Sequence, residues 1–201
     1  MKSLGYVLSV ALLLLSTAAF AQMDHKPAAP APSPAALQAQ NSFNLLKSLA
    51  GGWEGTFTTD PKIPQMGDGS KTLLLMRVTS RGNALVHEMF ERGKDNDPAK
   101  FDHPITLIHL DGDKLVLTHY CDAGNRPHMI AKTSSDGKTI DFDLVELSGS
   151  NQHGHMAHGT FTLVDADHHI EEWTYMMPGD KPLRARGDFH RVKDVSVGAG
   201  Q

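Results

Sequence analysis

His119 and Cys121 are two side chains with metal-ligand chemistry, two residues apart at the end of a strand-like segment over residues 114–121. Side chains alternate between the faces of a strand, so the pair shares one face. Imidazole and thiolate suit zinc or copper, but a metal site needs three or four ligands. The alternative to a metal site is therefore that the two side chains are neighbours by chance and make ordinary hydrogen bonds. Cys121 is the only cysteine, which excludes an internal disulfide.

A second group of histidines lies in residues 153–158. In a strand, His153 and His155 would share one face, and His158 would lie on the other. Three imidazoles this close together suit a soft or borderline metal at the mouth of a barrel. No carboxylate or cysteine completes a known ligand spacing, so solvated histidines at the rim are the alternative.

Several polar side chains fall on predicted strands among apolar residues, which is the composition of a small-molecule cavity. The candidates for its lining are His87, Glu88, His109, His119, Cys121, Glu146 and Glu172. They would orient a small apolar or amphipathic molecule, with methionines as a flexible wall. The alternative is that they pair with each other or with water. If such a ligand binds, the barrel should contain a cavity with a volume above about 300 Å³.

Nucleophilic catalysis has no support among the sequence motifs. The chain contains no Gly-x-Ser-x-Gly elbow, no His-Glu-x-x-His pair and no phosphate-binding loop. An isomerase or hydrolase that uses Glu and His in a cavity would need two titrating groups facing one another, and a sequence alone does not show this. Binding is therefore the predicted function. The net charge of −4 argues against nucleic acid or an anionic membrane surface as the partner.

The elements that would position these groups are strands joined by short turns. The ten predicted strands cover residues 53–59, 71–79, 84–91, 103–110, 114–121, 128–133, 139–147, 153–164, 168–177 and 183–192. Short connections make neighbours antiparallel. Closure removes the two open edges of such a meander, so the predicted fold class is an all-β, up-and-down barrel. A sandwich of two sheets is the alternative.

The N-terminal region predicts export. Residues 1–21 have a positive start, an apolar run and an Ala-x-Ala cleavage site, as in a signal peptide. The chain is therefore expected in the periplasm or outside the cell, and no apolar run is long enough to span a membrane. Residues 22–40 are rich in proline and alanine and predict a disordered spacer. A short helix capped by Ser42 would lid a barrel domain over 41–193, and 194–201 would form a tail.

Gly51-x-Trp53 after a short helix, ten strands and a basic last strand resemble the calycin superfamily. This group contains lipocalins, fatty-acid-binding proteins and nitrobindin-type haem barrels, and the chain looks most similar to exported bacterial barrels of unknown function. The resemblance covers about residues 42–193. It implies that Trp53 packs under Arg186 or Arg191 and closes the barrel. It also implies a candidate haem ligand near the end of the chain, His190, so haem stands beside zinc or copper as a cofactor alternative.

Overall fold

The computed structural model describes residues 31–92, 97, 99–133 and 136–193. The predicted signal peptide, residues 22–30 of the predicted spacer and the predicted tail over 194–201 lie outside these residues. Among the helices of the described ranges, none is both long and apolar enough to cross a membrane.

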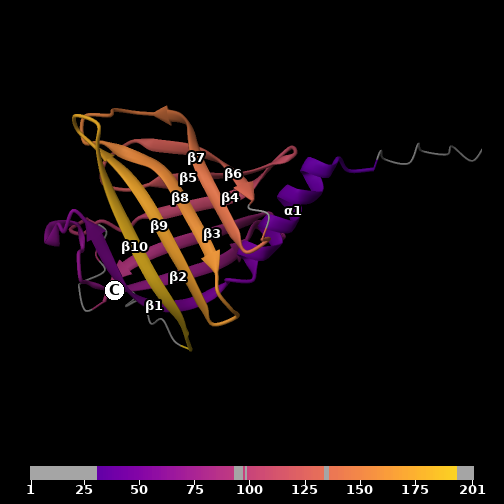
Figure 1. Cartoon of the computed structure of the whole chain (residues 1–201), viewed down its shortest axis with the longest axis horizontal. Coiled ribbons are helices and arrows are strands. Elements are labelled where there is room, and N and C mark those ends of the chain that lie inside the picture. The colour runs from indigo at the N-terminus through magenta and orange to yellow at the C-terminus, as the bar shows by residue number, and fades with distance from the viewer. Residues whose placement is uncertain (1–30, 93–96, 98, 134–135, 194–201) are drawn as a thin grey trace, which may run out of the picture. The chain divides into compact units, whose positions relative to one another are not determined.

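Ten antiparallel strands form a closed barrel in which each strand pairs with its neighbours in sequence, and the first pairs with the last (Figure 1). The predicted barrel is confirmed, and the sandwich alternative is wrong. The strands are β1 (Gly51–Asp60), β2 (Lys71–Thr79), β3 (Ala84–Glu91), β4 (Ile105–Asp111), β5 (Lys114–Tyr120), β6 (Arg126–Thr133), β7 (Thr139–Ser148), β8 (His155–Leu163), β9 (His168–Met177) and β10 (Lys181–Val192). Two short 3-10 turns, Pro64–Met66 and Ser80–Gly82, precede β2 and β3.

Helix α1 (Pro34–Lys47) begins earlier than the sequence indicated. The Ser33 hydroxyl caps it by accepting a hydrogen bond from the amide of Ala36 at 3.1 Å, and Pro34 occupies the first turn, where its missing amide costs nothing. The predicted cap, Ser42, is instead buried within the helix. The prediction of a spacer is therefore wrong for residues 34–40, where alanine, leucine and glutamine favour a helix.

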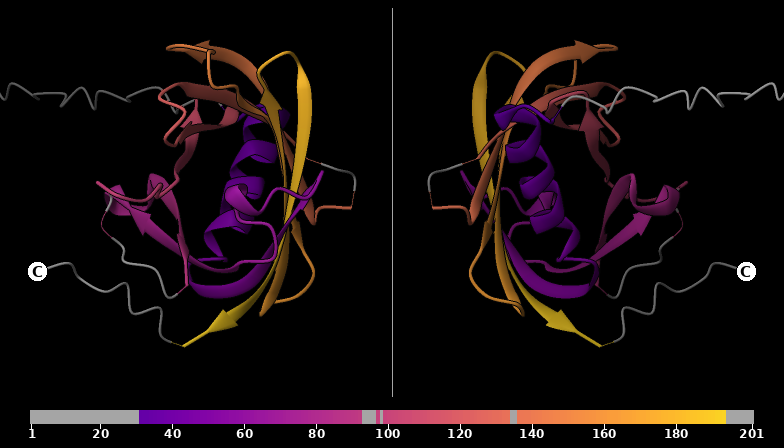
Figure 2. Two further views of the ribbon diagram at one scale, coloured as in Figure 1. Left: turned by 90° about the vertical axis from the view of Figure 1, so that its left-hand side faces the viewer. Right: turned by 90° about the vertical axis from the view of Figure 1, so that its right-hand side faces the viewer.

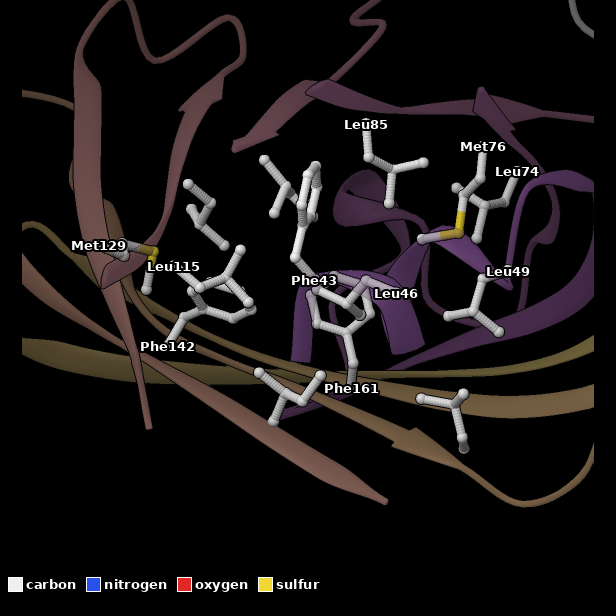
Figure 3. Close-up of a cluster of buried hydrophobic side chains, with 14 of the residues drawn as sticks. Phe43, Leu46, Leu49, Leu74, Met76, Leu85, Leu115, Met129, Phe142 and Phe161 are labelled. Atoms are coloured by element: carbon white, nitrogen blue, oxygen red, sulfur yellow. The ribbon is translucent and has the colours of Figure 1, made fainter. Parts of the chain in front are cut away.

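The helix fills one end of the barrel. Viewed from the end, the strands form a ring and α1 lies within its outline (Figure 2). Phe43 and Leu46 of the helix pack among Leu115, Phe142 and Phe161 of the wall (Figure 3). All five side chains are buried, so this end is a solid core and an interior site has to lie at the other end.

Candidate functional site

A carboxylate with no solvent exposure lies inside the barrel. Glu171 on β9 accepts hydrogen bonds at 3.1 Å from the Nε1–H of Trp173 and lies within hydrogen-bond distance of two histidines. Nε2 of His87 is 3.1 and 3.0 Å from its two oxygens, and Nε2 of His169 is 3.1 Å from Oε1. These residues form the buried Glu171 cluster.

Strand alternation explains how the cluster assembles. His169, Glu171 and Trp173 are alternate residues of β9, so their side chains share the inner face. His87 reaches Glu171 from β3, which does not pair with β9. Gly159 lies opposite Trp173 in β8, and a Cβ placed there would lie 2.6 Å from the indole. Glycine at this position thus makes room for the ring.

The histidines keep Glu171 ionised. Burial alone would raise the pKa of the carboxyl, but the charge of His87 and the hydrogen bonds from His169 and His87 outweigh it and hold the pKa well below its usual value. The second ring nitrogens of His87 and His169 are buried and have no partner among the described residues. The cluster thus has unused hydrogen-bonding capacity.

His119 on β5 is the second polar group of the interior. Its Nδ1 lies 2.9 Å from the hydroxyl of Thr106 on the neighbouring strand β4. Burial, and after it the charge of His87, lower the pKa of His119 to about 4. The imidazole is therefore neutral at physiological pH. Its Nε2 has no hydrogen-bond partner within the part of the chain that the structure describes.

A pocket of about 170 Å³ occupies the end of the barrel away from α1. His87, His119 and Trp173 line its inner part, and Phe57, Met89, Met156, Leu183 and Ala185 supply apolar walls. The pocket is smaller than the 300 Å³ that the sequence-based hypothesis required. It adjoins a hollow of about 430 Å³ with which it shares Phe57, Met89, Asp102, Pro104 and Asp122.

The mouth of the pocket is acidic. Ligand atoms of Asp102, Cys121 and Asp122 lie within 4.8 Å of one another. Burial and then the charge of Asp122 raise the pKa of Asp102 to about 6, while burial raises that of the Cys121 thiol to about 11. Burial also raises the pKa of Tyr175 to about 12, with help from the charges of the other three. The mouth therefore carries negative potential.

Trp53 and Arg191 close the opposite end, as the sequence resemblance implies. The two residues are paired in register between β1 and β10, and the guanidinium carbon lies 4.2 Å from the centre of the fully buried indole. The guanidinium also donates to the carbonyls of Ser48, Ala50 and Ala166. Arg186 does not contact Trp53: it faces outward and pairs with Asp188, so this half of the prediction is wrong.

Three predicted lining residues lie on the outer face of the barrel, which corrects the prediction. Glu88, His109 and Glu172 each come directly after a residue buried in the interior, and alternation turns them outward. Glu146 is exposed as well. Of the predicted lining, His87, His119 and Cys121 do reach the pocket.

Glu171 and His169 were not among the residues predicted to line the interior. The segment from His168 to Trp173 has polar residues on both faces, so alternation alone does not choose the inner one. Trp173 could have identified the inner face of this strand. A large indole in a strand is expected inside, and residues two and four positions before it must then face inward too.

The predicted histidine group does not converge. His153 is exposed, His155 bonds to Asn151 at 2.7 Å, and His158 lies outside the barrel against Asp143 at 2.8 Å. A register shift between Met156 and His158 breaks the alternation on which the prediction relied. His119 and Cys121 line the same pocket but do not gather a third ligand with them among the described residues. His190 is 66% exposed on the outer face, so it does not point at an interior haem.

Comparison with known proteins identifies the fold alone. No family model and no curated protein matches the chain. The crystal structure of Rv2717c from M. tuberculosis matches 81% of this chain and 100% of its own, with a TM-score of 0.54 and 12% identity. A DUF3598 protein of unknown function from Nostoc punctiforme PCC 73102 matches at a TM-score of 0.40 and 14% identity, over 73% of this chain and 48% of its own. At such identities, Rv2717c shares a barrel fold with this chain.

Proposed function

We propose that this chain is an exported, calycin-like barrel that binds a small molecule in the pocket beside His119 and Trp173. The observation that carries the proposal is His119, a neutral imidazole that is 6% exposed, lines the pocket and has a ring nitrogen without a partner in the described part of the chain. A ring nitrogen that no protein group satisfies can hydrogen-bond a ligand in the pocket. The contact of Trp53 with Arg191 supports the calycin-like assignment.

The pocket volume limits the size of the ligand. A cavity of about 150 Å³ is known to hold benzene, so about 170 Å³ accommodates a body of roughly one aromatic ring. The adjoining hollow leaves room for a substituent that extends toward the mouth. The ligand is thus an apolar ring or short chain with a polar group that hydrogen-bonds to His119.

The acidic mouth selects the charge of the ligand. Asp102 and Asp122 line the pocket, and no lysine or arginine of the described chain does. Within the pocket, a carboxylate ligand would meet like charge without a compensating cation; Lys100 lines the adjoining hollow and pairs with Asp97 at 3.0 Å. The pocket therefore favours neutral or cationic molecules over fatty-acid-like anions.

Three probes with one ring and different charges test this proposal: benzylamine, benzyl alcohol and benzoate. Each is titrated into the mature protein while the fluorescence and indole NMR signals of Trp173 are followed. We expect saturable binding in the order benzylamine, benzyl alcohol, benzoate. If none of the three binds saturably, or if benzoate binds most tightly, the proposal is wrong.

A matched pair of variants locates the probe. His119→Leu removes the ring nitrogen and should weaken benzyl alcohol by about tenfold while leaving toluene unchanged. His128 is the control, because it too lies beside a threonine hydroxyl, that of Thr118 at 3.2 Å, but on the outer face. His128→Leu should leave both affinities unchanged. Equal effects of the two substitutions would contradict binding at His119.

A further inference from the structure

The outer wall of the barrel carries two histidines side by side. His168 of β9 and His190 of β10 are directly opposite in the register of the two strands. Their rings stack with centroids 4.3 Å apart and an interplanar angle of 19°. Both side chains lie on the face opposite to the pocket, so this pair is separate from the proposed binding site.

Both imidazoles turn toward one carboxylate oxygen. Oδ1 of Asp188, two residues before His190 on the same strand face, lies 2.9 Å from Nε2 of His168 and 3.5 Å from Nε2 of His190. The three ligand atoms all lie within 4.8 Å of one another. Two imidazoles and one carboxylate on neighbouring strands therefore converge on one point.

We propose that His168, Asp188 and His190 bind a divalent transition-metal ion, zinc or copper, on the outer wall of the barrel. Imidazole and carboxylate ligands are the set that these ions accept, and three protein ligands leave a position open for water or an external molecule. To bind the ion, each ring presents the lone pair of its Nε2, and any proton on that nitrogen moves to Nδ1 or is released to solvent. Zn–N bonds of about 2.0–2.1 Å require the rings to close around it, and the exposed His190 has the freedom to rotate.

The surroundings fit such a site. Arg186 lies 3.3 Å from Oδ2 of Asp188 and leaves Oδ1 to the histidines, as an outer contact that orients a ligating carboxylate does. Glu54 of β1 is opposite His190 in register, but its carboxylate pairs with Arg92 and is not one of the three clustered ligand groups. Among the described histidines, His158 also has two carboxylate neighbours, Asp141 and Asp143, but no second imidazole.

Zinc titration of the mature protein by calorimetry at neutral pH tests the proposal. We expect one saturable site in the wild type. His190→Ala and His168→Ala should each weaken it by at least about tenfold, because loss of a direct ligand costs at least as much as loss of an outer contact. His158→Ala is the matched control and should leave the affinity unchanged. Melting temperatures without metal confirm that each variant is folded.

Cys121→Ser separates this site from the mouth of the pocket, where Asp102, Cys121 and Asp122 also lie close together. Zinc affinity that survives Cys121→Ser but falls in His190→Ala supports the outer site. If zinc affinity falls in Cys121→Ser and is unchanged in His190→Ala, the proposal of an outer site is wrong. A metal-induced rise in melting temperature should likewise disappear only in the His168 and His190 variants, because an ion that binds the folded state stabilises it.

Discussion

Nε2 of His87 lies 3.0 Å from Oε2 of Glu171, and this contact spans the barrel interior between β3 and β9, two strands that do not pair. Both side chains are buried. Replacing a buried ion pair with apolar residues is often neutral or stabilising, so such a pair is weak evidence for a role in stability. Its structural consequence is that His87 is held in place at the pocket wall, with His119 lining the same pocket.

Removing the Glu171 carboxylate should strongly destabilise the barrel. Glu171→Leu leaves two buried histidines and the Trp173 indole without their shared acceptor, and breaking a buried pair costs about 3–5 kcal/mol. Urea unfolding measures the loss. Glu172→Leu is the matched control on the next residue, and it should change the free energy of unfolding by less than about 0.5 kcal/mol because Glu172 is exposed.

A combined substitution tests whether the buried Glu171 cluster itself stabilises the barrel, or whether a loss of stability appears only when one member of the cluster is removed. Replacing His87, His169 and Glu171 together with leucine should recover most of the stability that Glu171→Leu loses, because only the indole N–H of Trp173 is then left without its partner. His119 is retained in this variant, so benzyl alcohol should still bind more tightly than toluene. Unfolding free energies no better than those of Glu171→Leu would show that the cluster stabilises the barrel directly.

The architecture could be predicted because turns and alternation are local properties. The predicted bounds of β2, β3 and β9 coincide with the structure, and closure follows from the need to pair edge strands. The inner face could not be chosen where both faces carry apolar residues. In β3, Phe90 faces outward yet is buried, with its ring 5.1 Å from that of His103. Because the outer face of β3 also carries buried apolar residues, the sequence pattern does not show that His87 faces inward and Glu88 outward.

The acidic mouth was not predictable for a different reason. Asp102 lies in the connection before β4, and it meets Cys121 and Asp122 only because β4 and β5 form a hairpin with this register. Its carboxylate accepts a hydrogen bond from the amide of Asp122 at 3.0 Å. Contacts between loop residues depend on the path of each loop, and alternation within strands does not describe that path.

Arg191 should contribute far more to stability than Arg186. Arg191→Ala removes hydrogen bonds to the carbonyls of Ser48, Ala50 and Ala166 and the cover over Trp53, which together should cost roughly 2–3 kcal/mol. Arg186→Ala removes an exposed ion pair worth at most about 1 kcal/mol. Urea unfolding of the two variants compares them directly. Equal losses would mean that the Arg191 contacts do not hold the closed end together.

His119 should make stability depend on pH. Its pKa is about 4 in the folded protein and about 6.5 in the unfolded chain, so between these values only the unfolded chain binds the proton. The contribution of His119 to the free energy of unfolding is therefore fully present above about pH 6.5. It is lost as the pH drops toward 4, by roughly 3 kcal/mol. Imidazole NMR signals should show a neutral His119 at pH 5.

A variant isolates this effect from other titrations in the same range. Asp102 acts in the opposite direction, because its raised pKa means that the folded state holds a proton between about pH 4 and 6. The difference between wild type and His119→Gln removes the contribution of Asp102, which both proteins share. This difference should shrink as the pH falls from 6.5 toward 4. A difference that stays constant would show that His119 is not kept neutral by the fold.

Asp102 should also control the affinity for cationic probes. Burial, and after it the charge of Asp122, raise its pKa to about 6, so Asp102 becomes an anion as the pH rises from 5 to 7. Benzylamine stays protonated over this range and should bind about two- to fivefold more tightly at pH 7, the gain expected for a partly exposed ion pair. Benzyl alcohol serves as the uncharged control and should show no such rise. Asp102→Asn should abolish the pH dependence for benzylamine while leaving benzyl alcohol affinity unchanged, and a rise that persists in this variant would assign the effect to another group at the mouth.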